Sequence, residues 1–175
     1  MIEIRPKTYT EPGHVLLTKN CIDHLQFRIE QEDFSSRLYL AMSLWLDNAG
    51  YMGAAKTWRG YAAEEAKHAD WARTYLLSMG ILPCTAALKQ PQEKFTGLPE
   101  IIRLSHEHEK QITQQCNTLA TTAFKEGDHM LYTLASKYLA EQVEELGKLD
   151  NLVSQLKSFG EDKIAMRLFD HELLG

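Results

Sequence analysis

Apolar residues recur along most of this chain at alternating steps of three and four, the spacing that keeps one face of a helix toward a core. The pattern predicts four long amphipathic helices, over residues 16–47, 54–79, 99–126 and 129–159. A glycine follows close behind the end of each of these segments: Gly50, Gly80, Gly127 and Gly160. Glycine is common just past a helix end, so the boundaries agree with the periodicity.

The two ends of the chain show different patterns. Residues 1–15 contain Pro6, Pro12 and Gly13 and have no periodicity, which predicts an irregular arm. Residues 162–173 predict a short fifth helix. We therefore expect an irregular arm over 1–15 and one helical domain over 16–175.

The lengths of the connections predict how the helices are arranged. The first two helices and the last two are joined by short turns, so each pair should be antiparallel. Residues 81–97 lie between the second and third helices and look non-helical. A segment of this length can span about 56 Å when extended, and a 30-residue helix is about 45 Å long. The sequence thus predicts an all-α four-helix bundle in which one long crossover makes the second and third helices parallel.

Composition and charge narrow the class of protein. The 175 residues are 44% hydrophobic, with a mean hydropathy of -0.34, and no apolar run is long enough to span a membrane. The start of the chain lacks a secretory signal pattern, and Cys21, Cys84 and Cys116 show no Cys-x-x-Cys spacing. We therefore expect a cytoplasmic protein without disulfides. The net charge of -5 argues against a nucleic-acid partner.

Each long helix carries one carboxylate at mid-length, on the face that should be apolar. These residues are Glu32, Glu65, Glu109 and Glu145, and His68 follows Glu65 by one turn. Burying a charge is costly unless it is compensated, and few lysines or arginines occupy core positions. Two divalent cations would balance four carboxylates, so a dinuclear metal site is the leading hypothesis. The alternative for any single glutamate is a polar layer or a paired ion that fixes helix register.

Further carboxylates lie beside these positions. Glu64 precedes Glu65, and Glu141 and Glu144 precede Glu145 by four residues and one residue. Like charges at such spacings destabilise a helix, which would favour a third cation here. The alternative is a surface pair between Glu144 and Lys148.

A tyrosine, two histidines with the glutamate between them, and a Glu-x-x-His segment are further candidates for a role at this site. Tyr39 lies seven residues after Glu32 on the same face, where it could hydrogen-bond a ligand, donate an electron or simply pack. His106, Glu107 and His108 straddle the apolar face of their helix and are expected to be solvated. Residues 126–129 read Glu-x-x-His, but Gly127 places them in a turn.

Four segments together resemble the bacterial non-haem ferritins, and the likeness extends over about residues 16–173. The segments are Glu32-Asp33-Phe34-Ser35-Ser36-Arg37-Leu38-Tyr39, Ala63-Glu64-Glu65-Ala66-Lys67-His68, Glu109-Lys110-Gln111-Ile112-Thr113-Gln114 and Glu141-Gln142-Val143-Glu144-Glu145. The resemblance implies the ferritin-like fold, which is a bundle of the predicted topology.

The resemblance also implies a ferroxidase centre. The first iron would be held by Glu32, Glu65 and His68, and the second by a bridging Glu65 with Glu109 and Glu145. Gln142 would lie nearby, and Tyr39 matches the tyrosine beside the family's centre. A third iron site would be formed by Glu64, Glu141 and Glu144.

The function implied is iron storage, in which Fe²⁺ is oxidised by dioxygen or peroxide and kept as ferric mineral inside a shell of 24 copies. Haem is not expected, because Ala66 stands where the related bacterioferritins have a haem-binding methionine. By analogy with the family, Glu126, Asp128 and His129 would line an iron uptake pore.

Two other functions remain open at this point. A soluble di-iron peroxidase of rubrerythrin type would use the same bundle without a mineral store, although no Cys-x-x-Cys segment is present to supply electrons. A non-catalytic metal-buffering or DNA-shielding shell is the second, and the acidic balance disfavours it. The spacing alone does not identify the metal, since manganese accepts the same ligands.

Overall fold

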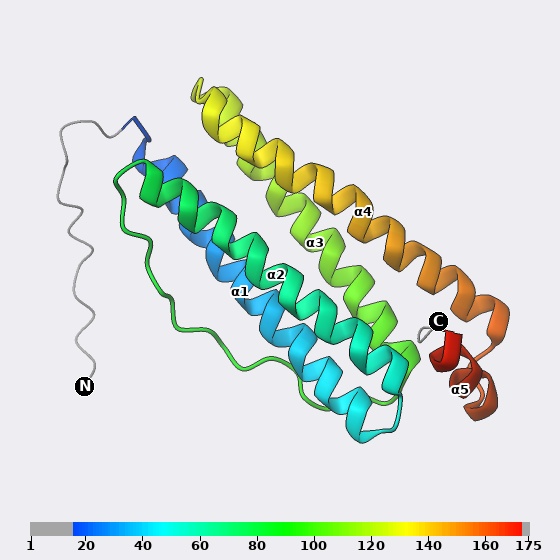
Figure 1. Cartoon of the computed structure of the whole chain (residues 1–175). Coiled ribbons are helices and arrows are strands. Elements are labelled where there is room, and N and C mark those ends of the chain that lie inside the picture. Colours follow the sequence, from blue (N-terminus) through cyan, green and yellow to red (C-terminus); the bar gives the residue numbers. More distant parts are fainter. Residues whose placement is uncertain (1–15, 173–175) are drawn as a thin grey trace.

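The structure is a computed structural model and describes residues 16–172. Its five helices are α1 (Lys19–Asn48), α2 (Met52–Ser78), α3 (Leu98–Lys125), α4 (His129–Phe159) and α5 (Lys163–Glu172). The four long helices form a bundle, and α5 lies at one end of it (Figure 1). The predicted all-α class and four-helix bundle are confirmed. The predicted arm over 1–15 and the predicted end of the fifth helix at residue 173 lie outside the described residues.

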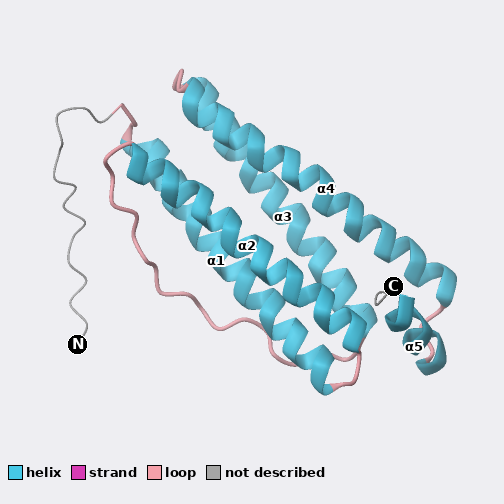
Figure 2. Ribbon diagram, viewed as in Figure 1, coloured by secondary structure: helices cyan, strands magenta, loops and turns pink. Residues whose placement is uncertain are grey.

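Two short turns and one long loop connect the helices of the bundle. Residues 49–51 join α1 to α2, and residues 126–128 join α3 to α4, so each of these pairs is antiparallel. Residues 79–97 run along the bundle as a loop (Figure 2). This loop is the predicted crossover, and it makes α2 and α3 parallel. Within residues 16–172, no helix is long and apolar enough to cross a bilayer.

Local hydrogen bonds fix where the helices begin. The Thr18 hydroxyl accepts a hydrogen bond from the Cys21 amide at 3.2 Å, and the Asp128 carboxylate accepts one from the Leu131 amide at 2.9 Å. Such side chains satisfy amides that the first turn of a helix leaves unpaired. Gly127 has a φ of 70°, which glycine adopts more readily than other residues, and it reverses the chain between α3 and α4.

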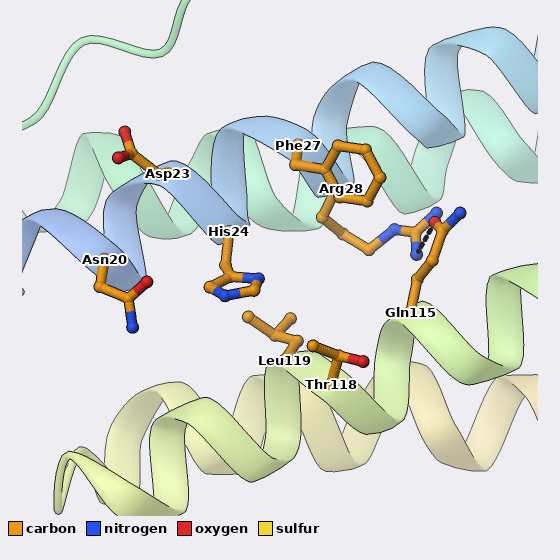
Figure 3. A pocket seen from close by; sticks show the side chains of 8 residues that line it. All are labelled: Asn20, Asp23, His24, Phe27, Arg28, Gln115, Thr118 and Leu119. Carbon is orange, nitrogen blue, oxygen red and sulfur yellow. Dashed lines mark hydrogen bonds between the residues drawn. The ribbon is translucent and has the colours of Figure 1, made fainter.

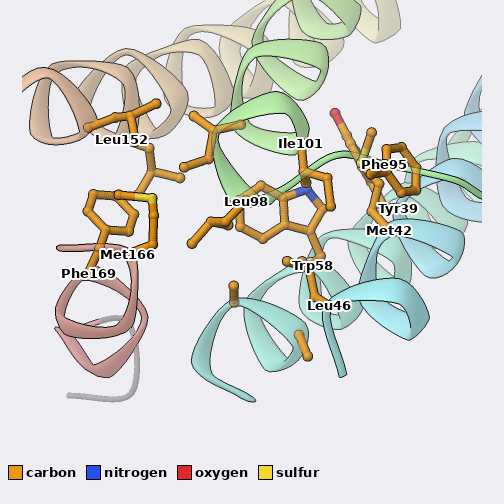
Figure 4. Close-up of a cluster of buried hydrophobic side chains, with 14 of the residues drawn as sticks. Tyr39, Met42, Leu46, Trp58, Phe95, Leu98, Ile101, Leu152, Met166 and Phe169 are labelled. Atoms are coloured by element: carbon orange, nitrogen blue, oxygen red, sulfur yellow. The ribbon is translucent and has the colours of Figure 1, made fainter. Parts of the chain in front are cut away.

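The apolar core is divided into two clusters along the bundle axis. One cluster includes Met42, Trp58, Ile101, Leu152 and Phe169, and it lies near the end that carries α5 (Figure 4). The other occupies the opposite half of the bundle and contains Leu25, Ile29, Leu76, Ile112 and Leu131.

A polar layer separates these two clusters. On α1, for example, Glu32 lies between Ile29 of one cluster and Tyr39 of the other. On α3, Glu109 likewise lies between Ile102 and Ile112. The four helices therefore present their mid-length carboxylates at one level, with apolar packing above and below.

The short helix α5 closes one end of the bundle. Met166 and Phe169 are buried in the cluster at that end. The buried carboxylate of Asp170 accepts a hydrogen bond from the Ala54 amide at 2.8 Å, in the first turn of α2. Arg167 donates to the Ala49 carbonyl at 3.2 Å. These contacts connect α5 to the turn before α2 and to the start of that helix.

Replacing Asp170 with alanine should destabilise the domain, because it leaves the buried amide of Ala54 without an acceptor. We expect a loss of about 1–3 kcal/mol in the free energy of unfolding, measured by chemical denaturation of the metal-free protein. Glu172→Ala, at an exposed position of the same helix, is the matched control and should change stability by less than about 0.5 kcal/mol. Equal losses in both variants would contradict a specific role for Asp170.

Candidate metal centre

The four mid-helix carboxylates and His68 are all buried and meet inside the bundle. Ligand atoms of Glu32, Glu65 and His68 lie within 4.8 Å of one another. Ligand atoms of Glu65, Glu109 and Glu145 meet the same condition. Glu65 belongs to both groups, so the helices assemble two potential ion positions that share one carboxylate. Oxygen and imidazole ligands of this kind suit iron, manganese and zinc.

A small cavity lies at the second of these positions. Its volume is about 10 Å³, and its lining includes Tyr39, Tyr61, Glu65, Glu109 and Glu145. That space is close to the volume that one water-sized sphere requires. The three carboxylates therefore surround a space on the scale of a single ion.

Neighbouring polar side chains orient Glu109. The Tyr39 hydroxyl donates a hydrogen bond to Glu109 Oε1, and the Gln142 amide donates to Glu109 Oε2 at 3.1 Å. The same amide also donates to Glu145, and the Thr113 hydroxyl holds the Gln142 carbonyl at 2.7 Å. Hydrogen bonds behind ligand residues fix ligand geometry in metal sites. Tyr39 and Gln142 are thus placed to position the carboxylates of α3 and α4.

Burial changes the protonation of these residues in the absence of metal. Desolvation, followed by repulsion from neighbouring carboxylates, raises the pKa of Glu65 well above its usual value and that of Glu145 to about 9. Burial also raises the pKa of Glu109 and lowers that of His68. With its pKa at about 9, Glu145 is protonated at neutral pH in the metal-free centre, and the raised pKa values of Glu65 and Glu109 favour protonation there too. An entering cation would displace these protons.

One buried arginine faces this layer, and it is the one Lys or Arg among the buried residues that the structure describes. Arg28 Nε lies 2.8 Å from Glu32 Oε1, and both side chains are almost fully buried. Figure 3 shows Arg28 between α1 and α3, with its hydrogen bond to Gln115. The prediction that these carboxylates lack a basic partner is therefore wrong for Glu32. The spacing of four residues on one helix was the sequence signal for this pair.

Two aromatic residues support His68 from behind. The Trp71 ring packs on the imidazole of His68 with 4.6 Å between ring centroids, and Lys137 Nζ lies 3.6 Å from the Trp71 centroid. The Tyr138 hydroxyl donates to the His68 carbonyl at 2.6 Å. Trp71 is three residues after His68, a spacing that places both on one helix face. The sequence pattern predicts no role for Trp71 or Tyr138.

His108 is not solvated as predicted. Its Nε2 lies 2.7 Å from the Ser35 hydroxyl, and its ring packs edge-on against Tyr39 with centroids 5.9 Å apart. Burial, followed by repulsion from Arg28, lowers the pKa of His108 to about 4, so the ring is neutral at physiological pH. His106 is also partly covered and pairs with Asp150, whereas Glu107 is exposed as expected. The prediction of a solvated His108 is wrong because this residue borders the apolar face of its helix, where a neighbouring helix can still cover it.

The carboxylates predicted for a third cation are only partly brought together. Glu141 lies near His68 and Glu145, and ligand atoms of these three residues are within 4.8 Å of one another. Glu64 instead faces Lys148 at 4.0 Å, and Glu144 is exposed. The group that forms around Glu141 therefore uses His68 and Glu145 in place of Glu64 and Glu144.

Both carboxylates of the turn between α3 and α4 accept hydrogen bonds from the first turn of a helix. Glu126 accepts a hydrogen bond from the side-chain amide of Asn20 at 2.5 Å and from Cys21 Sγ at 3.3 Å. These bonds connect Glu126 to the first turn of α1. Asp128 caps α4. Within this chain both residues have structural partners, so the uptake pore inferred by analogy gains no support from their contacts.

Known proteins share the fold of this chain. The sequence model of the ferritin family, described as a ferritin-like domain, matches residues 22–159. This chain belongs to the ferritin family. The matched range contains all four long carboxylate-bearing segments, and the resemblance seen in the sequence is confirmed.

Individual ferritins agree with this assignment. The chain is 35% identical over 158 residues to a probable bacterial non-heme ferritin-like protein of Haemophilus influenzae, covering 90% of this chain and 96% of that protein. It is 30% identical to the bacterial non-heme ferritin of Escherichia coli, covering 90% and 96%. Among solved structures, an open pore ferritin from Archaeoglobus fulgidus matches with a TM-score of 0.87 and 28% identity, covering 90% of this chain and 97% of that one.

Proposed function

We propose that this ferritin oxidises Fe²⁺ at the centre formed by α1–α4 and stores the ferric product as mineral inside a hollow shell of 24 copies. Family membership supports iron binding and storage. The observation that carries the proposal is the pair of buried three-ligand groups that share Glu65. Iron is the substrate in this account, and no haem is required.

The shared carboxylate explains why two ions would react together. One Fe²⁺ would be bound by Glu32, Glu65 and His68, and the other by Glu65, Glu109 and Glu145. The oxidation balances as two Fe²⁺, one dioxygen and two protons giving two Fe³⁺ and one hydrogen peroxide. With peroxide as the oxidant, two Fe²⁺, one hydrogen peroxide and two protons give two Fe³⁺ and two waters. In both cases two electrons leave the pair of irons at once, which avoids a one-electron radical product.

The surrounding residues would hold the ligands during this reaction. Tyr39 and Gln142 bond the two oxygens of Glu109 separately, so each can steady the carboxylate while one oxygen turns to the metal. Tyr138 fixes the backbone at His68. The group of His68, Glu141 and Glu145 shares His68 with one ion position and Glu145 with the other, so it would be the first stop for iron that leaves the centre.

Aerobic iron loading followed by size-exclusion chromatography tests the storage function. We expect a particle of shell size that elutes with far more than two irons per subunit, because the mineral grows beyond the centre. A Glu107→Ala variant, altered at an exposed position of α3, should load equally well. A dimer that retains only two irons per subunit would contradict storage and indicate a peroxidase of rubrerythrin type. A shell that binds iron without oxidising it would indicate a metal buffer.

A further inference from the structure

Arg28 is a buried cation in direct contact with the candidate centre. Its side chain is 2% exposed, and its Nε lies 2.8 Å from Oε1 of Glu32, which is 1% exposed. On the other side of the guanidinium, Nη1 donates to Gln115 Oε1 at 3.0 Å and to Cys116 Sγ at 3.6 Å (Figure 3). Arg28 therefore bridges α3 and the Glu32 carboxylate without reaching solvent.

The two oxygens of Glu32 have different surroundings. Oε1 faces Arg28, whereas Oε2 is buried and has no hydrogen-bond partner among the described residues. Arg28 Nε and Nη2 also lack an aligned hydrogen bond there, so the contact with Oε1 is mainly a charge pair. A buried carboxylate oxygen without a partner is costly, and a cation bound with Glu65 and His68 would satisfy it.

We propose that Arg28 is a positioning residue that holds Glu32 by Oε1, leaves Oε2 as its single metal-binding oxygen, and weakens the ion bound by Glu32, Glu65 and His68. This inference rests on the proposed function and deepens it, since it concerns how tightly one of the two ions is held.

The charge balance supports this weakening. Two divalent cations neutralise the four carboxylates, so the guanidinium is a surplus positive charge once the centre is full. In the metal-free protein the same charge compensates Glu32, whose ionised form would otherwise be buried alone. The second group also has a basic neighbour, Lys148, which lines its cavity. The Lys148 side chain is 43% exposed, however, and solvent screens its charge far more than that of Arg28.

Zinc titration of the metal-free protein by calorimetry tests the proposal. Wild type should bind two Zn²⁺ per subunit. Arg28→Gln should raise the affinity of one of the two ions, the one that Glu32 binds, about tenfold or more, because a nearby positive charge is removed and Glu32 gains a second free oxygen. Arg28→Lys keeps the charge and should stay within about threefold of wild type. Arg37→Gln, which removes an exposed charge from the same helix, should also leave both affinities unchanged.

An unchanged or reduced affinity in Arg28→Gln would overturn the proposal while leaving the centre itself intact. If wild type instead fails to bind two Zn²⁺, and Glu65→Ala binds like wild type, the proposed function fails as well. A zinc-bound crystal of the wild-type protein gives a test that does not depend on the variant folding. We expect Glu32 to bind Zn²⁺ through one oxygen with Arg28 still on the other. Chelation through both oxygens, with Arg28 displaced, would contradict the proposal.

Discussion

Replacing Glu65 with alanine should remove nearly all rapid iron oxidation. Glu65 is the one residue common to both three-ligand groups, so its loss weakens both ion positions at once. Changes to residues that merely support metal ligands already cost about 10–100-fold, and we expect a fall of about a hundredfold or more here. The initial rate is followed by stopped-flow absorbance of the ferric product after mixing the metal-free protein with Fe²⁺ and dioxygen.

The stoichiometry of zinc binding tests the bridging role of Glu65 independently of iron oxidation. Glu65→Ala should bind neither Zn²⁺ tightly, whereas Glu109→Ala should lose one ion and keep the other. Glu107→Ala provides the control, because it removes an exposed carboxylate two residues from Glu109 on the same helix. A full initial rate in Glu65→Ala, with normal folding, would refute its bridging role.

The metal-free protein should lose stability as the pH rises from about 7 toward 9, above the range in which the histidines titrate, and bound metal should abolish this trend. In the folded state the pKa values of Glu65, Glu109 and Glu145 are raised, that of Glu145 to about 9, chiefly by burial. The unfolded chain ionises near the ordinary value of 4.5, so between these limits the folded state holds more protons. Each extra proton lowers the free energy of unfolding by about 1.4 kcal/mol per pH unit.

Thermal unfolding at matched ionic strength measures this dependence. Glu145→Gln should flatten the slope, since the amide does not titrate, and should raise the melting temperature of the metal-free protein at pH 8. Glu144→Gln, its exposed neighbour, serves as the control. Calorimetry in buffers of different ionisation enthalpy should also show protons released on Zn²⁺ binding. A metal-free protein whose stability rises from pH 7 to 9 would contradict protonated carboxyls at the centre.

The sequence was sufficient to predict most of the fold. Steps of three and four located the long helices to within a few residues, and the length of the segment between the second and third helices implied the crossover. The same periodicity placed Glu32, Glu65, Glu109 and Glu145 at one depth, because a charge at an apolar position stands out against the pattern. These features are local or nearly so, which is why a single sequence reveals them.

Contacts between helices were harder to predict. Arg28 has a long side chain that could have extended to the surface, so its spacing from Glu32 did not show that it turns inward. His108 became partly buried because α1 packs over it, and the interaction of Asp170 with Ala54 depends on where α5 docks. Glu64 turned toward Lys148 of another helix. Each of these depends on the rotation and distance of a neighbouring helix, which periodicity does not specify.

We expect paired irons to neutralise the carboxylates buried between the two apolar clusters. Crystals soaked anaerobically with Fe²⁺ and measured at the iron absorption edge test it most directly. We expect two anomalous peaks per subunit, one at Glu32, Glu65 and His68 and one at Glu65, Glu109 and Glu145, with Glu65 contacting both. Anomalous peaks confined to surface carboxylates, with the buried layer unchanged and free of iron, would contradict the account.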